Sequence, residues 1–159
     1  MKRPLVFIAG TVLILAASML PGADARQSVA NHSRRDSKIV AAIRAVLDAQ
    51  VAAWNRGDIE GFMEGYWRSP ETVFVSGDTI THGWQTVLDR YRKGYSTREK
   101  MGTLTFSDLD IKLISKDAAL ATGRWQLQRA QDTPHGRFTL IFRKTKEGWR
   151  IVHDHTSSG

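Results

Sequence analysis

The spacing of apolar residues along the chain changes once, near Gly102. Before this residue, apolar positions recur at steps of three and four, which is the period of one helix face. After it, apolar and polar positions alternate, which is the period of a strand with one buried face. The pattern therefore predicts an α+β fold, in which helices come first and pack on one face of a curved antiparallel sheet.

Three helices and one hairpin are predicted before Gly102. The first helix ends where Gly57 supplies a left-handed backbone conformation. Asp58 then caps the second helix, which stops before Pro70. β-branched residues on both sides of Gly77 indicate the hairpin. In chain order, the predicted elements are helix 38–55, helix 59–67, strands 72–76 and 79–82, and helix 84–95.

Four strands are predicted after Gly102, separated by turns of polar residues and glycine. In the last three strands the alternation identifies one apolar face, which we expect to pack on the helices. On this reading Asp154 points outward, away from the helices. The inward residues of the last three strands are Ala119, Ala121, Gly123, Trp125, Leu127, Phe138, Leu140, Phe142, Trp149, Ile151, His153 and His155.

The strand that follows Gly102 changes its phase in the middle. Leu104 and Phe106 share one face, whereas the apolar residues from Leu109 onward share the other. One extra residue near Ser107 or Asp108 restores the alternation, which predicts a β-bulge and a bend in the sheet. In the next strand, a run of small inward residues leaves room for either a closely packed helix or a ligand: Ala119, Ala121 and Gly123.

The first 25 residues have the pattern of a secretory signal peptide. Lys2-Arg3 precedes an apolar run from Leu5 to Leu20, and Ala23-Asp24-Ala25 forms a cleavage site. The apolar run is shorter than the roughly 20 residues that span a bilayer. We therefore expect cleavage after Ala25 and a periplasmic or secreted protein without a membrane segment. Residues 26–36 are then a flexible leader, and 37–157 form the single domain.

The composition narrows the range of chemistry. The chain has no cysteine, which excludes disulfide bonds and cysteine-ligated zinc. Its formal charge of +7 comes from basic residues that are mixed with acidic ones, which favours a solvated surface over a nucleic-acid partner. It has no phosphate-binding glycine loop and no dinucleotide fingerprint, and so no cofactor is expected.

Two motifs resemble those of a known family. They are Trp54-Asn55-Arg56-Gly57-Asp58, after the first helix, and the terminal stretch Gly148 to Ser157, which reads GWRIVHDHTS. Together with the order of elements, they resemble the SnoaL-like branch of the nuclear transport factor 2-like superfamily over about 37–157. The resemblance implies a cone with a pocket between sheet and helices, commonly in a homodimer formed through the sheet.

The same resemblance implies several kinds of chemistry. Enzymes of the superfamily include ketosteroid isomerases, scytalone dehydratases, limonene epoxide hydrolases and polyketide cyclases, which act through pocket carboxylates, tyrosines or histidines. No catalytic carboxylate can be carried over to this chain, because Asp154 is expected to point outward. Many members of the superfamily are not enzymes, and fold alone does not establish an activity.

His153 and His155 are the catalytic candidates, because they are the only polar residues on an apolar inward stripe. An imidazole exchanges a proton near neutral pH. The alternative is a pair of hydrogen-bonded core histidines. A metal site is not expected, since no third ligand accompanies the pair. The ligand-binding candidates, which could equally be core aromatic residues, are Tyr66, Trp67, Tyr91, Tyr95 and Trp125.

Two functions of different classes follow. The first is an exported pocket protein for a small apolar or aromatic molecule, either a ligand binder or a non-covalent acid-base enzyme of the isomerase, dehydratase or cyclase type. The second is a non-enzymatic homodimerisation module whose cone is filled by its own side chains. In either case the expected dimer contact lies on the outer face of the sheet, at Arg124, Gln126, Gln128, Thr139 and Arg143.

Overall fold

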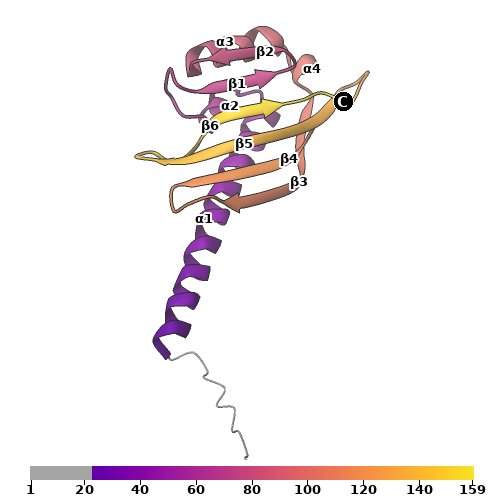
Figure 1. The fold of residues 1–159 in the computed structure, drawn as a ribbon. Coiled ribbons are helices and arrows are strands. Elements are labelled where there is room, and N and C mark those ends of the chain that lie inside the picture. The colour runs from indigo at the N-terminus through magenta and orange to yellow at the C-terminus, as the bar shows by residue number, and fades with distance from the viewer. Residues whose placement is uncertain (1–22) are drawn as a thin grey trace, which may run out of the picture.

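The fold comes from a computed structural model, which describes residues 23–159 (Figure 1). Most of the expected signal peptide therefore lies outside the described residues. The elements are α1 (Ala23–Asn55), α2 (Ile59–Met63), β1 (Val73–Ser76), β2 (Thr79–His82), α3 (Trp84–Gly94), α4 (Arg98–Met101), β3 (Thr103–Leu113), β4 (Ala118–Gln128), β5 (His135–Thr145) and β6 (Gly148–Thr156).

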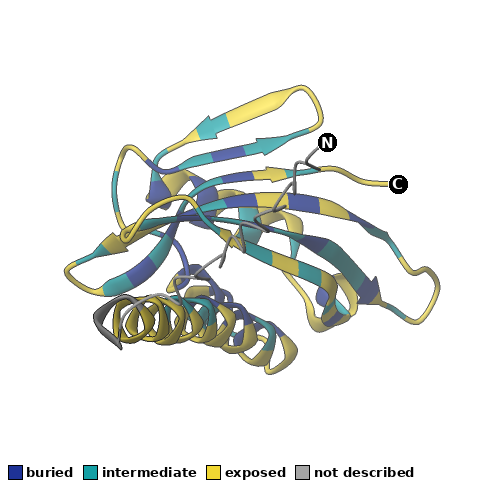
Figure 2. Ribbon diagram, turned by 60° about the horizontal axis from the view of Figure 1, so that its bottom comes forward, coloured by how far each residue is buried: buried dark blue, intermediate teal, exposed yellow. Residues whose placement is uncertain are grey.

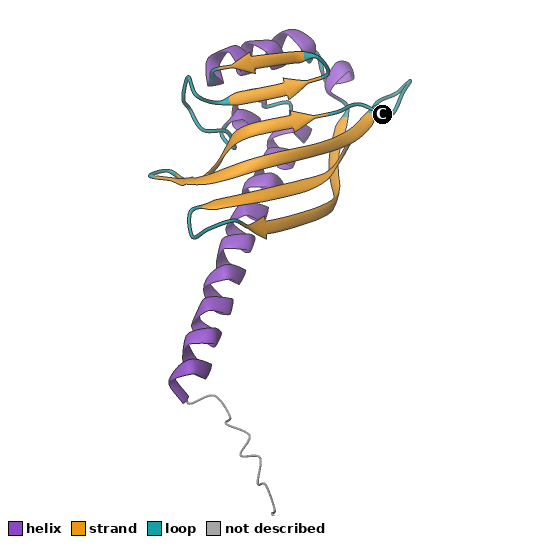
Figure 3. Ribbon diagram, in the orientation of Figure 1, coloured by secondary structure: helices purple, strands orange, loops and turns teal. Residues whose placement is uncertain are grey.

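One curved sheet forms the centre of the molecule. Its strand order is β2-β1-β6-β5-β4-β3. All neighbouring strands are antiparallel except β1 and β6, which pair in parallel. Helix α1 crosses one face of the sheet, and the short hairpin β1–β2 carries α3 at its edge (Figure 3). The predicted α+β arrangement, with helices on one face of a curved sheet, is confirmed.

Helix α1 begins earlier than the sequence pattern indicated. Residues 26–36, which we expected to form a flexible leader, are helical. No glycine or proline occurs between Ala23 and Gly57, and so nothing in the local sequence stops the helix from extending. The Nε2 atom of His32 lies 3.1 Å from a carboxylate oxygen of Asp36, one turn later. The side chains of this part are largely exposed, because it projects beyond the sheet (Figures 1 and 2).

No helix in the part of the chain from residue 23 onward is long and apolar enough to cross a membrane. A short helix that the pattern did not predict, α4, follows α3. Its first turn is capped by Thr97, whose hydroxyl accepts a hydrogen bond from the backbone of Lys100.

The motif at the end of α1 fastens this helix to the sheet. The Asn55 side chain bonds both backbone groups of Leu104 in β3, at 2.7 and 3.0 Å. The Trp54 indole donates to the backbone oxygen of Met101. Asp58 caps α2 by accepting a hydrogen bond from the backbone of Gly61 at 2.7 Å, as its position predicted. These bonds fix the start of β3 against the end of α1.

Two bulges bend the sheet. The first lies in β3 between Ser107 and Asp110, where Asp108 has a positive φ of 53°, and it confirms the bulge predicted from the change of phase. The second lies in β6, and the sequence pattern did not reveal it. There Ile141 pairs with His153 while its neighbour Phe142 pairs with Ile151, and so Val152 is an extra residue.

The β6 bulge reverses the phase of every residue after it, and our expectation for this segment was wrong. Asp154, expected outside, is 4% exposed and lies opposite the inward Leu140. His153 is half-buried and His155 is exposed. Because directly opposed residues of neighbouring strands share a face, the pairing of His155 with the outward Thr139 places both histidines on the outer face.

The small inward residues of β4 pack within the core. Ala119 and Ala121 are fully buried, and a Cβ atom added to Gly123 would lie 2.5 Å from the ring of Phe138 and 2.9 Å from Leu109. The run is therefore closely packed, but at Gly123 the space is filled by side chains of the neighbouring strands β5 and β3 and not by a helix. The space for a ligand lies elsewhere in the cone.

Candidate functional site

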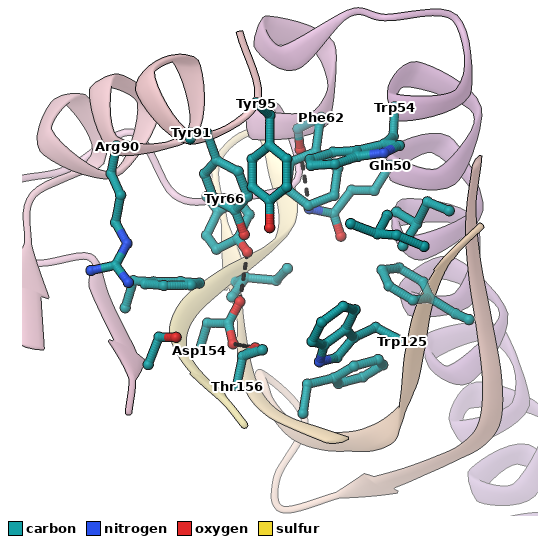
Figure 4. Close-up of a pocket in the computed structure, with 18 of the residues that line it drawn as sticks. Gln50, Trp54, Phe62, Tyr66, Arg90, Tyr91, Tyr95, Trp125, Asp154 and Thr156 are labelled. Atoms are coloured by element: carbon teal, nitrogen blue, oxygen red, sulfur yellow. Dashed lines mark hydrogen bonds between the residues drawn. The ribbon is translucent and has the colours of Figure 1, made fainter. Parts of the chain in front are cut away.

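A cavity of about 380 Å³ opens between the concave face of the sheet and the helices (Figure 4). This volume is at the small end of the range for small-molecule sites. Its wall is mainly aromatic, and three lining residues in its interior are polar: Gln50, Tyr66 and Asp154. The aromatic and apolar wall is formed by Trp54, Phe62, Phe74, Tyr91, Tyr95, Leu104, Phe106, Trp125, Leu127, Phe138, Leu140 and Ile151.

Asp154 supplies the one carboxyl group among the described residues that line the cavity. Its Oδ2 accepts a hydrogen bond from the Tyr66 hydroxyl at 2.6 Å, and its Oδ1 accepts one from Thr156 at 2.6 Å. Burial raises the pKa of Asp154 to about 6, although the bonds from Thr156 and Tyr66 and the nearby charge of His155 oppose this rise. The carboxyl group therefore changes its charge close to neutral pH.

The tyrosines around this carboxyl group act as neutral donors. Burial, followed by the charge of Asp154, raises the pKa values of Tyr66 and Tyr91 well above the usual 10. Burial also raises the pKa of Tyr95. In Figure 4 the hydroxyl of Tyr91 lies beside that of Tyr66, and the hydroxyl of Tyr95 points into the cavity. A bound molecule thus meets a carboxyl group and protonated phenols.

Gln50 supplies a further polar group from α1. It is 2% exposed, and its side-chain nitrogen donates to the backbone oxygen of Phe62 at 3.0 Å. Its oxygen is directed toward the cavity (Figure 4). Sequence analysis missed this residue, although a signal existed: Gln50 is three residues after Leu47 and four before Trp54, and so it lies on the apolar helix face.

Four of the five predicted ligand-binding residues are brought together here. Tyr66, Tyr91, Tyr95 and Trp125 line the cavity, and the Trp125 indole is held by a 2.9 Å hydrogen bond to the backbone oxygen of Ser157. The aromatic rings of α1 to α3 also contact one another, with 4.7 Å between the centroids of Trp54 and Tyr95. They serve both the core and the cavity wall.

The remaining predicted residues lie elsewhere. Trp67 does not line the cavity, and its backbone nitrogen bonds Ile151 at 2.9 Å. His153 and His155 lie on the outer face of the sheet, beside Val73 and Val75 of β1. Because the β6 bulge turns them away, neither imidazole lines the cavity, and the proposed catalytic role for them has no geometric basis there. The bulge turns Asp154 to the inner face of the sheet, where the two histidines were expected.

Other residues of the cavity were not identified from sequence. The polar lining residues that are partly exposed form what we call its rim: Arg90, Arg129, Ser76, Thr156 and Ser158. Apart from Thr156 and Ser158, these residues are far from one another in sequence, and none carries a local signature of a site. For metals, residues 23–159 contain no group of three or more His, Cys, Asp or Glu side chains placed to hold an ion.

Comparisons with known proteins agree on the family and the fold. The SnoaL-like domain family matches residues 43–159. A nuclear transport factor 2-like protein of unknown function from Shewanella oneidensis is 39% identical, with 74% of this chain and 98% of that chain covered and a TM-score of 0.72. None of the curated proteins compared with the chain matches it.

Two more distant structures show likeness of fold alone. A nuclear transport factor 2-like superfamily protein from Salmonella enterica is 23% identical, with a TM-score of 0.63 and 77% and 92% of the two chains covered. A candidate scytalone dehydratase from Novosphingobium aromaticivorans is 10% identical, with a TM-score of 0.68 and 80% and 88% covered. The feature that these structures share with the chain is the fold, in which helices pack on one face of a curved sheet.

Proposed function

Because the chain belongs to the SnoaL-like domain family and encloses a cavity, we propose that it binds a small apolar or aromatic molecule and transfers a proton on it through Asp154. The observation that carries this proposal is the position of that carboxyl group. Asp154 is the only acid among the residues that line the cavity, and it is buried among aromatic side chains. Such an environment is where proton-transfer groups are found in proteins.

The hydrogen bonds of Asp154 leave it able to act on a ligand. Each carboxylate oxygen has two acceptor positions, and each receives one bond from the protein, from Tyr66 or from Thr156. The remaining positions are available for a proton from the bound molecule. A pKa near 6 keeps both the acid and the base form populated around neutral pH, which general acid-base catalysis requires.

The phenols can stabilise the negative charge that such a reaction develops on the bound molecule. When a base removes a proton from a carbon beside a carbonyl group, negative charge develops on the carbonyl oxygen. The hydroxyl of Tyr95, which points into the cavity, or that of Tyr91 can donate a hydrogen bond to this oxygen. Return of the proton from Asp154 to another carbon gives isomerisation. Its transfer to a hydroxyl group on the neighbouring carbon, which then leaves as water, gives dehydration.

The volume of the cavity separates this proposal from the alternative of a dimerisation module with a filled cone. About 380 Å³ of space beside Asp154 counts against a filled cone. The fold shared with a candidate scytalone dehydratase is consistent with the dehydratase form of the chemistry. A binder that performs no reaction uses the same cavity, and the experiment below distinguishes it.

The test combines a binding screen with proton exchange. Small aromatic ketones that shift the melting temperature of the wild type are incubated with it in deuterated buffer, and exchange at the carbon beside the carbonyl is followed by NMR. We expect Asp154→Asn to slow this exchange at least about 100-fold while retaining binding. His153→Ala, on the outer face, is the matched control and should keep full activity. Binding without exchange identifies a binder, and no bound ketone at all refutes the proposal.

A further inference from the structure

Two arginines from distant parts of the chain belong to the partly exposed rim of the cavity. Arg90 belongs to α3, and Arg129 directly follows β4. The other rim residues, such as Ser76 and Ser158, are uncharged. Asp154 contributes an acid, but it lies in the interior, where it is already bonded to Tyr66 and Thr156. The rim is therefore positively charged, although the wall is apolar.

Arg129 has few hydrogen-bond partners for a side chain that is only 26% exposed. Its Nε is shielded from solvent and has no partner, and it is the only such side-chain atom found in residues 23–159. Its one ion pair, to the exposed Asp132, is long at 3.5 Å. Because a buried donor without an acceptor is unfavourable, an acceptor brought to this guanidinium by a ligand would be favoured.

Arg90, unlike Arg129, has no carboxylate partner in the described part of the chain. Its guanidinium lies 5.2 Å from the centroid of Phe74, a cavity residue, and its one hydrogen bond is the long 3.4 Å contact to Thr81. Arg56 and Arg92 differ, since each bonds a neighbouring carboxylate. The two rim arginines are thus less engaged by carboxylates than Arg56 and Arg92 are.

The positive charges of Arg90 and Arg129 both influence Tyr95. Burial raises the pKa of Tyr95, and the charges of Arg129 and Arg90 both oppose this rise. The phenol of Tyr95 points into the cavity between the helices and the sheet (Figure 4). An anionic group placed near the Tyr95 hydroxyl would be attracted by both charges.

We propose that the ligand of this cavity is a carboxylic acid with one or two rings, held by its carboxylate at the rim between Arg90 and Arg129. This inference rests on the proposed function and adds the charge and orientation of the ligand. A carboxylate suits guanidinium groups, which can bind it through two parallel hydrogen bonds. Asp154, when ionised, repels the carboxylate, and so the uncharged end of the ligand is the one that reaches the interior.

The experiment compares two probes of nearly equal shape, 1-naphthoate and its neutral amide, 1-naphthamide. Binding to the wild-type protein is measured by quenching of tryptophan fluorescence at pH 7.5 and low salt. We expect naphthoate to bind at least about tenfold more tightly than naphthamide. Arg129→Gln and Arg90→Gln should each remove most of this preference and leave the affinity for naphthamide within about twofold.

Two further variants complete the design. Arg34→Gln makes the same change of charge on the exposed part of α1 and should leave both affinities unchanged. Arg129→Lys retains the charge without the guanidinium fork and should give an intermediate preference, which guards against a folding defect in Arg129→Gln. Melting curves establish that each variant is folded.

The possible results separate the two proposals. Equal affinity for both probes, or an equal loss of both in the arginine variants, overturns the carboxylate inference and leaves the cavity as a site for neutral molecules. If neither probe binds and no neutral aromatic ketone binds, the proposed function fails together with this inference.

Discussion

Replacement of Asp154 by asparagine should change how the stability of the protein depends on pH. The wild-type carboxyl group is buried and hydrogen-bonded to two hydroxyl groups, whereas the amide of the variant has nearly the same shape and cannot ionise. The amide keeps one acceptor, and so one of the two hydroxyl bonds is weakened. That loss is largely independent of pH, and the ionisation term can therefore be measured against it.

The expected size follows from the pKa values. The ordinary value for the Asp154 carboxyl is 3.8, and burial raises it to about 6 in the folded protein. Between these values the folded protein binds more protons than the unfolded chain, and so the free energy of unfolding falls as the pH rises. The contribution is fully present below the unfolded pKa of 3.8 and is lost as the pH passes through about 6. The loss between about pH 4.5 and 7 is about 2 kcal/mol.

Urea unfolding of wild type and Asp154→Asn, at one protein concentration and several pH values, measures this effect. When the free energies of unfolding of the two proteins are subtracted, the contributions from the titration of other groups cancel. We subtract the free energy of unfolding of the wild type from that of the variant at each pH. This difference should be about 2 kcal/mol more positive at pH 7 than at pH 4.5. Asp78→Asn, in the exposed hairpin turn, is the control and should show no such trend. A difference that stays constant across this range refutes an elevated pKa for Asp154.

Four further outcomes are expected. Asn55→Ala removes both side-chain bonds to Leu104 and should lower the free energy of unfolding by about 1–2 kcal/mol, measured by urea unfolding. Gly123→Ala forces a methyl group against Phe138 and should cost about 1–3 kcal/mol in the same assay, whereas an unchanged midpoint would contradict the close packing. Intact mass of the exported protein should give Arg26 as its first residue; a form that retains Lys2 contradicts cleavage. Light scattering at micromolar concentration and low salt should show a homodimer that weakens as salt is added, and a monomer under those conditions removes the proposed outer-face contact.

Much of the fold could be predicted because buried positions recur in the sequence with the period of the helix or strand that contains them. The change of apolar period at Gly102 separated helices from strands, and the shift of phase after Phe106 located the first bulge. Asp58 marked the start of α2. Inward aromatic residues of the predicted helices, such as Tyr66 and Tyr91, followed from the same periodicity and do line the cavity, although Tyr66 lies just beyond α2.

The identity of the central polar group could not be predicted in this way. The alternation in β6 is regular on both sides of Val152, and only the pairing of this strand with β5 reveals that one residue is extra. The shift moves two imidazoles outside and brings Asp154 inside. The sequence pattern therefore pointed to β6 as a source of a polar group on the inner face, but it named His153 and His155 where the structure places Asp154.

The sequence by itself thus determined the class of fold, the order of its elements and the aromatic character of the cavity, because these depend on periodicity within single segments. Only the tertiary structure decided which polar groups share the cavity. Gln50, Asp154 and Arg129 come from three separate segments, and their meeting depends on strand register and on how the helices lie across the sheet. Register is set by hydrogen bonds between strands, and a shift of one residue turns every following side chain to the opposite face.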